Sequence, residues 1–416
     1  MLCQFSVKNY RSIKEEVTLD MQAAAITEHR DHLLTDKGGE DFLPVAVIYG
    51  PNGGGKSNVL RALNVLLIKL MAPICAACPR REKEFCPPFE KIRINPFKFC
   101  EESLNSPTEF EIFFRTDKSE YRYNIQILNE EVVYESLYKK DTGKTRTSKL
   151  FVRDINAKII FSMGIPFNGI KIPEISKTLP LLSYLMMIYS ENKIVHDILL
   201  WVERGIMGVN FADSRTDSRI NILMIKKEKE VCLKMLKNLD IDIENYEVLD
   251  KGKDKGKDIL TDHNVNGKIT RLDLNEESSG TIKLFSVLPE LVRCLFKGAT
   301  FIADELDSKL HPKLLKYIIE LFTDKHINTK NAQLIFTSHD LSTMTSDIFR
   351  RDEIWFAAKN AEQATSLYSL VEFKDKSTGK STRKDANFNK QYLEGRYGAD
   401  PYLRKMIDWE AVSSEN

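Results

Sequence analysis

Residues 45–60 read VAVIYGPNGGGKSNVL, and this stretch constrains the fold more than any other part of the chain. An apolar run typical of a buried strand ends at a glycine-rich loop, and apolar residues then recur at helical spacing. Glycines let consecutive backbone N–H groups point into one concavity, and the N-terminus of the following helix adds partial positive charge. The segment therefore predicts a strand–loop–helix unit that binds phosphate groups.

The loop also matches the pattern G-x-x-x-x-G-K-[ST], with the strand before it and the helix after it that the pattern requires. In this pattern Lys56 reaches the β- and γ-phosphates of a nucleotide, and Ser57 ligates Mg²⁺. A chance match has a probability on the order of one per cent in a chain of this length and composition. The other nucleotide-binding candidates in this segment are Gly50, Pro51, Asn52, Gly53, Gly54, Gly55 and Asn58.

Composition and charge limit the class of protein and the location that we expect for this chain. Of the 416 residues, 42% are hydrophobic and 29% charged, which is ordinary for a soluble globular protein, and the net charge of +1 argues against a global basic field for nucleic acid. The N-terminus lacks the apolar core of a signal peptide, and the apolar run 179–189 is too short to span a bilayer. Seven cysteines without a secretory signal predict a reducing, cytoplasmic location and no membrane association.

The chain divides into four expected parts: 1–165, 166–242, 243–372 and 373–416. Most of the first 170 residues alternate as strands do, including a short run at 157–163, whereas 172–242 is helical in pattern and is interpreted as an insertion standing off the strand-rich body. Asn266-Gly267 predicts a hairpin turn. From residue 281 onward, short apolar strands alternate with helices, which predicts a buried parallel sheet in an α/β fold.

Two further strands end in polar side chains. The run ATFIADELD delivers Asp304 and Glu305 to the C-terminal end of a strand, where ligands of open α/β sheets bind. Asp304 is expected to hold the Mg²⁺ shell and Glu305 to activate the attacking water as general base. Taken alone, the pair fits a helix cap equally well, and the phosphate loop decides against the cap. The run LIFTSHD ends the next strand at His339, a position suited to sensing a γ-phosphate.

The segment NEESSGTIKLF places Ser278, Ser279 and Gly280 directly before a helix. This pattern is an ordinary N-cap, and the same geometry makes an anion site at a helix N-terminus. Because the chain already has a complete phosphate loop, we expect this second site to serve a nucleotide that is bound by another copy.

In this order, GPNGGGKS, ESSGT, DELDS and TSH resemble the ABC-type ATPase head shared by SMC, RecF and OLD proteins. The chain is more similar still to compact AAA-type ATPases of bacterial abortive-infection and phage-defence systems, AbiL-like with RloB-like partners. The opening FSVKNYRSIKEEVTLDM and the closing YLEGRYGADPYL support the resemblance, which covers about two-thirds of the chain. It implies a P-loop NTPase head with an N-terminal antiparallel β subdomain, a parallel core sheet and an inserted helical subdomain.

The resemblance also implies roles for residues. ATP and Mg²⁺ are the implied cofactors, and a head-to-tail homodimer, or a higher even oligomer, closes over two ATP molecules. Lys56 and Ser57 of one subunit then face Ser279 and Gly280 of the other. Asp304 and Glu305 become the Walker B pair, Asp307 the D-loop residue and His339 the switch histidine, with Lys56, Glu305 and His339 as the catalytic set. Arg11 and Ser12 match a segment that lies near the nucleotide in relatives, and Gln126 is a candidate for the Q-loop glutamine.

Four cysteines, Cys75, Cys78, Cys86 and Cys100, form a cluster that begins with C-x-x-C. Two close and two looser cysteines are compatible with a tetrahedral Zn²⁺ site, although reduced thiols without metal are the favoured interpretation.

For function, the sequence favours an ATPase whose dimerisation senses or gates a partner effector, a nuclease or toxin, in anti-phage defence. Two alternatives remain open: a RecF-like protein in which ATP controls DNA binding, and a low-turnover scaffold that holds an effector inactive. Contact with nucleic acid through a local basic surface remains open as well.

Overall fold

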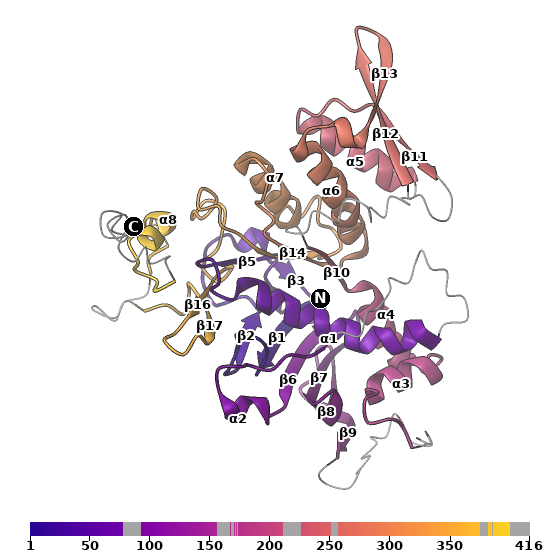
Figure 1. Ribbon diagram of the computed structural model, residues 1–416, viewed down its shortest axis with the longest axis vertical. Helices are drawn as coiled ribbons and strands as arrows, with labels where there is room; N and C mark the ends of the chain where they lie inside the picture. Colours follow the sequence, from indigo (N-terminus) through magenta and orange to yellow (C-terminus); the bar gives the residue numbers. More distant parts are fainter. Residues whose placement is uncertain are drawn as a thin grey trace, which may run out of the picture.

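The computed structural model describes residues 1–77, 93–155, 167, 170, 172, 174–210, 226–250, 257–374, 382–384 and 386–399. The strand expected at 157–163 and the end of the C-terminal extension lie outside these residues. The described part contains a six-stranded antiparallel sheet and a six-stranded, mainly parallel sheet, with helices around both (Figure 1). This mixed α/β architecture confirms the predicted fold class.

The antiparallel sheet has the strand order β2-β1-β6-β7-β8-β9. Its side chains alternate between buried and less buried along β6 and β7, as expected for a sheet with one face in the core. The strands are β1 (Leu2–Lys8), β2 (Val17–Asp20), β6 (Thr108–Arg115), β7 (Ser119–Leu128), β8 (Glu131–Asp141) and β9 (Thr147–Asp154).

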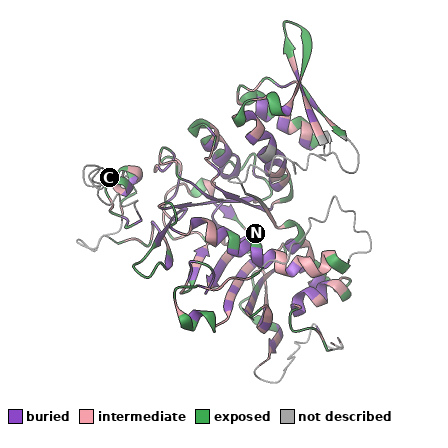
Figure 2. Cartoon of the chain, in the orientation of Figure 1, coloured by how far each residue is buried: buried purple, intermediate pink, exposed green. Residues whose placement is uncertain are grey.

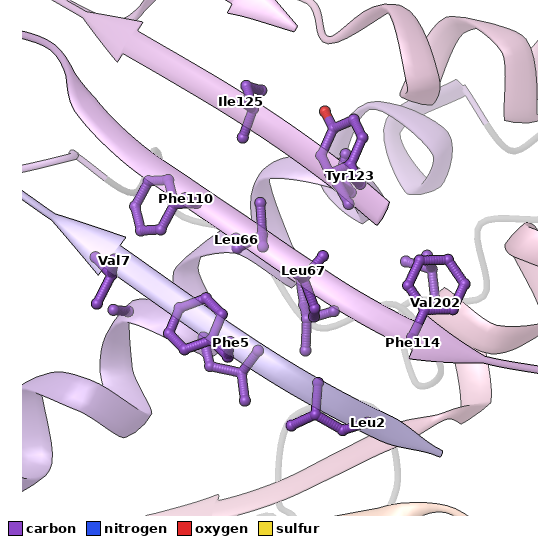
Figure 3. Packing of buried hydrophobic residues seen from close by; sticks show 14 of the residues in the cluster. Leu2, Phe5, Val7, Leu66, Leu67, Phe110, Phe114, Tyr123, Ile125 and Val202 are labelled. Carbon is purple, nitrogen blue, oxygen red and sulfur yellow. The ribbon is translucent and has the colours of Figure 1, made fainter. Parts of the chain in front are cut away.

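Helix α1 (Lys56–Ala77) packs between the two sheets. Its buried leucines share one core with Phe5 and Phe110 of the antiparallel sheet (Figure 3). Ile48 of the parallel sheet belongs to the same core. Among the described helices, α1 alone is long and apolar enough to cross a membrane by length and composition. Because this helix contributes its leucines to a core enclosed by both sheets, its apolar character is explained by packing inside the domain.

Two helices of the segment 172–242 pack against this body. The N-terminal amides of α3 (Leu181–Ile188) donate to the buried carboxylate of Glu135 on β8 at 2.7 and 2.8 Å. In α4 (Lys193–Arg204), the Trp201 ring stacks on Phe114 of β6 with centroids 3.9 Å apart. These contacts place α3 and α4 on the strand-rich body, so the expectation that they stand off it was wrong.

The second sheet has the order β10-β14-β15-β5-β16-β17, and all neighbouring pairs are parallel except β16 with β17. The parallel core predicted downstream of residue 281 is therefore present. Strand β10 was not foreseen, because the surrounding segment is helical in pattern. The strands are β5 (Val45–Tyr49), β10 (Ile206–Asn210), β14 (Thr300–Asp304), β15 (Gln333–Thr337), β16 (Ile354–Lys359) and β17 (Thr365–Ser369).

Successive residues of the parallel strands face two different cores. On β5, Ala46 and Ile48 belong to the core around α1, whereas Val45, Val47 and Tyr49 belong to a second core. Helices α5 (Lys226–Asn238), α6 (Ser279–Lys297) and α7 (Pro312–Thr323) contribute to this second core. Figure 2 shows the resulting concentration of buried residues along the central strands.

The remaining elements lie around this body. Strands β11 (Asn245–Asp250), β12 (Lys257–Val265) and β13 (Lys268–Asp273) form a small antiparallel sheet at the top of Figure 1. Asn266 and Gly267 between β12 and β13 have φ of 53° and 82°, which confirms the predicted hairpin turn. The short elements are β3 (Leu34–Thr35), β4 (Asp41–Phe42), α2 (Glu101–Leu104) and α8 (Phe388–Leu393).

One buried side chain joins the two large sheets. The amide oxygen of Gln333, at the start of β15, accepts the Leu2 N–H at 2.8 Å. Its amide nitrogen donates to the carbonyls of Leu2 and Leu43 at 3.1 and 3.2 Å. Gln333 is fully buried. Its side chain, and not water, therefore satisfies the Leu2 N–H and the carbonyls of Leu2 and Leu43.

We expect Gln333→Ala to lower the free energy of unfolding by about 2–4 kcal/mol, because each buried polar group left unpaired costs about 1–3 kcal/mol. Urea-induced unfolding of the full chain measures this change. Gln22→Ala, at an exposed side chain, serves as the matched control and should change stability by less than about 0.5 kcal/mol. Equal stabilities of the two variants would contradict this role of Gln333.

Candidate functional site

The predicted site residues follow the C-terminal ends of three adjacent parallel strands. Strand β15 lies between β5 and β14, and Thr337 pairs with Ile48 while Phe336 pairs with Ala303. Because the strands are parallel, the loops that leave β5, β14 and β15 emerge at the same edge of the sheet. The structure therefore gathers the glycine-rich loop, Glu305 and His339 at one edge.

The glycine-rich loop is backed closely by β16 and β17. A Cβ added at Gly55 would lie 2.1 Å from Thr365 Oγ1, and Gly55 has a φ of 103° that side-chain-bearing residues rarely adopt. A Cβ at Gly50 would lie 2.1 Å from the Ala357 carbonyl oxygen. Glycine is thus required at both positions, by the Thr365 side chain at Gly55 and by the Ala357 backbone at Gly50.

Lys56 is 5% exposed, and its ammonium donates to the carbonyls of Gly50 at 2.7 Å and Pro51 at 3.1 Å. Burial lowers the pKa of Lys56 to about 8, and the carboxylates of Glu305, Asp304 and Asp307 oppose this shift. Lys56 is therefore still mainly protonated at neutral pH, although its pKa lies only a little above that pH. A phosphate group beside it would favour the charged form.

Asp304 connects the loop to two strands. Its Oδ1 accepts hydrogen bonds from Ser57 Oγ at 2.8 Å and from Thr337 Oγ1 at 2.7 Å. The Arg61 guanidinium lies 4.0 Å from the other oxygen, Oδ2. A hydroxyl and a carboxylate in direct contact are the oxygen ligands that Mg²⁺ prefers, so Ser57 and Asp304 fit a shared Mg²⁺ site.

Glu305 has a φ of 52°, a left-handed conformation that is uncommon for residues with a Cβ. Its N–H donates to Thr337 Oγ1 at 2.6 Å, which holds the turn after β14 against β15. Backbone outliers of this kind cluster at functional sites because the surrounding contacts maintain them. Thr337 thus positions both members of the Asp304-Glu305 pair.

His339 and Asp307 are also adjacent. The His339 N–H donates to Asp307 Oδ2 at 3.0 Å, while Asp307 Oδ1 is buried and has no hydrogen-bond partner among the described residues. Burial and then the nearby Lys56 ammonium lower the pKa of His339, with Asp307 opposing them. The imidazole is therefore mainly neutral near pH 7 and available both as a donor and as an acceptor.

Ser12 lies beside the loop, and its expected role near the nucleotide stays a prediction. Its hydroxyl forms a hydrogen bond with Thr365 Oγ1 at 2.8 Å and accepts one from Asn58 Nδ2 at 2.7 Å. The neighbouring Arg11 has a φ of 51° and donates from Nε to the Tyr10 hydroxyl at 3.2 Å. The tight turn at Tyr10–Ile13 thus carries Ser12 to the loop.

Thr365, Thr337 and Arg61 were not anticipated as site residues. Thr365 Oγ1 donates to the Gly54 carbonyl at 3.1 Å, so this residue of β17 fixes the loop from behind. No local motif marks Thr365, because it meets the loop only through the pairing of β17 with β16. Thr337 did have a signal, since it stands in the TSH segment at the end of an apolar strand.

Ser278, Ser279 and Gly280 lie apart from the loop of the same chain. Ser278 caps α6 through its Oγ, which accepts the Thr281 N–H at 3.1 Å. Ser278 and Ser279 are exposed, and the nearest main-chain atom to an added Cβ at Gly280 is the Lys309 carbonyl oxygen at 3.7 Å. Among the described residues, no hydrogen bond joins this segment to residues 50–58.

Two further predictions remain open. Cys78 and Cys86 lie outside the described residues, while Cys75 and Cys100 are half-buried, so the Zn²⁺ site is untested. Within the described ranges, the group of potential metal ligands that approach one another is His29, Asp31 and His32. Gln126 lies on β7, where its amide donates to Glu109 at 3.2 Å.

The geometry is that of a P-loop nucleotide-binding site at the edge of a parallel sheet. A family model described as "AAA domain, putative AbiEii toxin, Type IV TA system" matches residues 45–161 and 197–345, well over half of the chain. The chain belongs to this family. No curated protein matches the sequence significantly.

Solved structures give likenesses at low sequence identity. The SMC head domain from Thermotoga maritima is 15% identical, with 88% of this chain and 98% of that chain covered and a TM-score of 0.41. An SMC head domain with a coiled coil and joint, derived from Pyrococcus yayanosii, is 10% identical, with 89% and 97% covered and a TM-score of 0.42.

We expect Thr365→Val to weaken ATP binding about fivefold, because it removes the hydroxyl that bonds Gly54 and Ser12 at a cost of about 1 kcal/mol. Isothermal titration calorimetry with ATP measures the dissociation constant. Thr365→Ser keeps the hydroxyl and should bind ATP as the wild type does. If valine and serine at this position bound ATP equally well, Thr365 would not support the loop.

Proposed function

We propose that this protein is an ATP-hydrolysing switch that dimerises through its nucleotides and gates a partner effector in bacterial anti-phage defence. One observation carries the proposal: the hydrogen-bonded group of Ser57, Asp304 and Thr337, with Lys56, Glu305 and His339 beside it, at one edge of a parallel sheet. This combination of a buried cation, an oxygen-ligand pair and adjacent acid–base groups suits phosphoryl transfer to water.

Nucleotide binding is assigned to the glycine-rich loop. Lys56 would exchange the Gly50 and Pro51 carbonyls for phosphate oxygens, and the loop N–H groups would hold the remaining phosphate charge. A Mg²⁺ ion held there would supply positive charge to offset the charge of the phosphates. Ser57 and Asp304 would hold this ion, and Thr337 keeps the Asp304 carboxylate oriented toward Ser57.

Hydrolysis is assigned to Glu305 and His339. Glu305 follows Asp304 directly, and its backbone is fixed by Thr337, so its carboxylate would accept a proton from the attacking water. His339, mainly neutral near pH 7, would donate a hydrogen bond to the terminal phosphate. Asp307 holds the backbone of His339 at that position.

The second half of each site is assigned to another copy of the chain. Ser279 and Gly280 lie apart from the loop of their own subunit, at the N-terminus of a 19-residue helix suited to an anion. Ser279 is exposed and Gly280 is half-buried, so this segment can cover a nucleotide bound by a second subunit. A head-to-tail homodimer, or a higher even oligomer, satisfies this requirement.

The effector is assigned to a separate protein. The sequence carries the glycine-rich loop, the Asp304-Glu305 pair and the His339 segment, all of which the proposal assigns to ATP. The family description, with its putative toxin of a type IV toxin–antitoxin system, supports a role in defence. A cytoplasmic location is part of the proposal, since the reduced cysteines and the phage target both suit it.

We expect Glu305→Gln to bind ATP with wild-type affinity, to lose at least about a hundredfold in hydrolysis, and to accumulate as an ATP-bound dimer, because only the general base is removed. Phosphate release and light scattering after gel filtration measure these effects. Lys56→Ala should lose ATP binding, and Glu320→Gln, an exposed residue of α7, should behave as wild type.

Two results would overturn these assignments. Hydrolysis by Glu305→Gln at the wild-type rate would exclude Glu305 as the base. ATP affinity unchanged by Lys56→Ala would exclude the glycine-rich loop as the nucleotide site.

A further inference from the structure

A cavity of about 710 Å³ lies at the opposite edge of the parallel sheet from the glycine-rich loop. Gly205, which precedes β10, Gly298, which precedes β14, and Asn331, which comes shortly before β15, all line it. Thr116, between β6 and β7, lines it from the antiparallel sheet. The cavity is therefore formed where the N-terminal edge of one sheet meets the other sheet.

The carboxylates of the cavity wall are engaged by other groups. Asp36 pairs with Arg115, and Asp117 pairs with Lys37 at 2.8 Å. Asp197 accepts hydrogen bonds from the Thr116 hydroxyl at 2.8 Å and the Tyr121 hydroxyl at 3.0 Å. Asp36 and Asp117 are thus neutralised by Arg115 and Lys37, whereas the charge of Asp197 is met only by hydroxyl groups and offsets one cation of the wall.

Three cations of the wall have no such partner. Arg204, Lys297 and Lys330 line the cavity and are exposed, and none of them forms an ion pair within the part of the chain that the structure describes. Arg204 and Lys297 each end a helix, where a cation offsets the partial negative charge of the C-terminus. Lys330 belongs to a loop, so the favourable charge at helix C-termini does not account for the presence of all three cations in the cavity wall.

Two aromatic residues complete the wall. Trp201 is only 7% exposed, and its indole N–H is buried without a hydrogen-bond partner among the described residues. Because the indole nitrogen has no access to solvent, it offers no donor to a ligand in the cavity. Phe296, by contrast, is 40% exposed, which is unusual for a large apolar side chain, and the Lys227 ammonium lies over its ring, 5.4 Å from the centroid.

We propose that this cavity is a second ligand site, distinct from the glycine-rich loop, that binds a small phosphate-bearing molecule. Arg204, Lys297 and Lys330 supply the charge for the phosphate, and the exposed part of the Phe296 ring supplies apolar contact for a ring such as a nucleobase. The proposal is independent of ATP hydrolysis and goes beyond the function proposed above.

The location of the cavity gives this site access to the ATPase elements. Helix α6 begins at Ser279 and ends at Lys297 in the cavity wall. Strands β14 and β15 start at this edge and end at Asp304 and Thr337. A ligand held here contacts one end of the elements whose other ends carry the candidate ATP site.

The test uses the full chain with Lys56→Ala, which disables the glycine-rich loop. Sodium pyrophosphate and 5′-AMP are titrated separately by calorimetry, and tryptophan emission is followed in parallel. The titration with pyrophosphate measures the binding of phosphate groups alone. The titration with AMP measures the binding of a phosphate that carries a nucleobase. The test variant is Lys297→Glu/Lys330→Glu, and the matched control is Lys234→Glu/Lys268→Glu, two exposed lysines elsewhere with the same change in charge.

We expect saturable binding of at least one probe, weakened at least about tenfold by Lys297→Glu/Lys330→Glu and unchanged by the control pair, since losing charged hydrogen-bond donors costs more than about 1.4 kcal/mol. The emission change should disappear in Trp201→Phe while calorimetric binding persists. Absence of binding by both probes would overturn the proposal. Equal weakening by both lysine pairs would also overturn it, because the attraction would then be general and not specific to the cavity.

Discussion

The candidate site depends on the hydrogen bonds that the Asp304 carboxylate accepts. One of its oxygens accepts hydrogen bonds from Ser57 at the start of α1 and from Thr337 at the end of β15. These three residues come from segments separated by 247 and 33 positions in the chain. They can meet only if β5, β15 and β14 lie side by side and parallel. The order of strands in the central sheet is therefore the condition for the chemistry.

A second layer of contacts makes that edge rigid. The glycine-rich loop has Thr365 and the Ala357 carbonyl directly behind it, and Ser12 joins Thr365 to Asn58. Ser12 comes from the antiparallel sheet region, which Gln333 fastens to the parallel sheet at the opposite edge. The antiparallel sheet thus does more than enlarge the core: through Ser12 it reaches the loop that is proposed to bind ATP.

Much of this could be predicted from the sequence, because the informative patterns are local. The glycine loop, the Asp304-Glu305 pair and the His339 segment each follow an apolar strand, and parallel pairing then brings them together. Strand β10 was missed because a five-residue strand between helices owes its existence to pairing with β14, which the local pattern does not show. Thr365 was missed for the same reason: its role arises from the β16–β17 hairpin folding behind the loop. The position of α3 was mispredicted because its attachment depends on the buried Glu135, a long-range contact.

The central claim is that each ATP site is shared between two copies of the chain, and a mixing experiment tests it directly. Ser279→Arg blocks the covering segment and leaves the loop intact, whereas Lys56→Ala disables the loop and leaves the covering segment intact. Each variant alone should lack ATP hydrolysis. An equimolar mixture should recover about a quarter of the wild-type rate, because half of the dimers then hold one native site of two. Wild-type hydrolysis by Ser279→Arg alone, or no recovery in a mixture that forms dimers, would contradict the shared site.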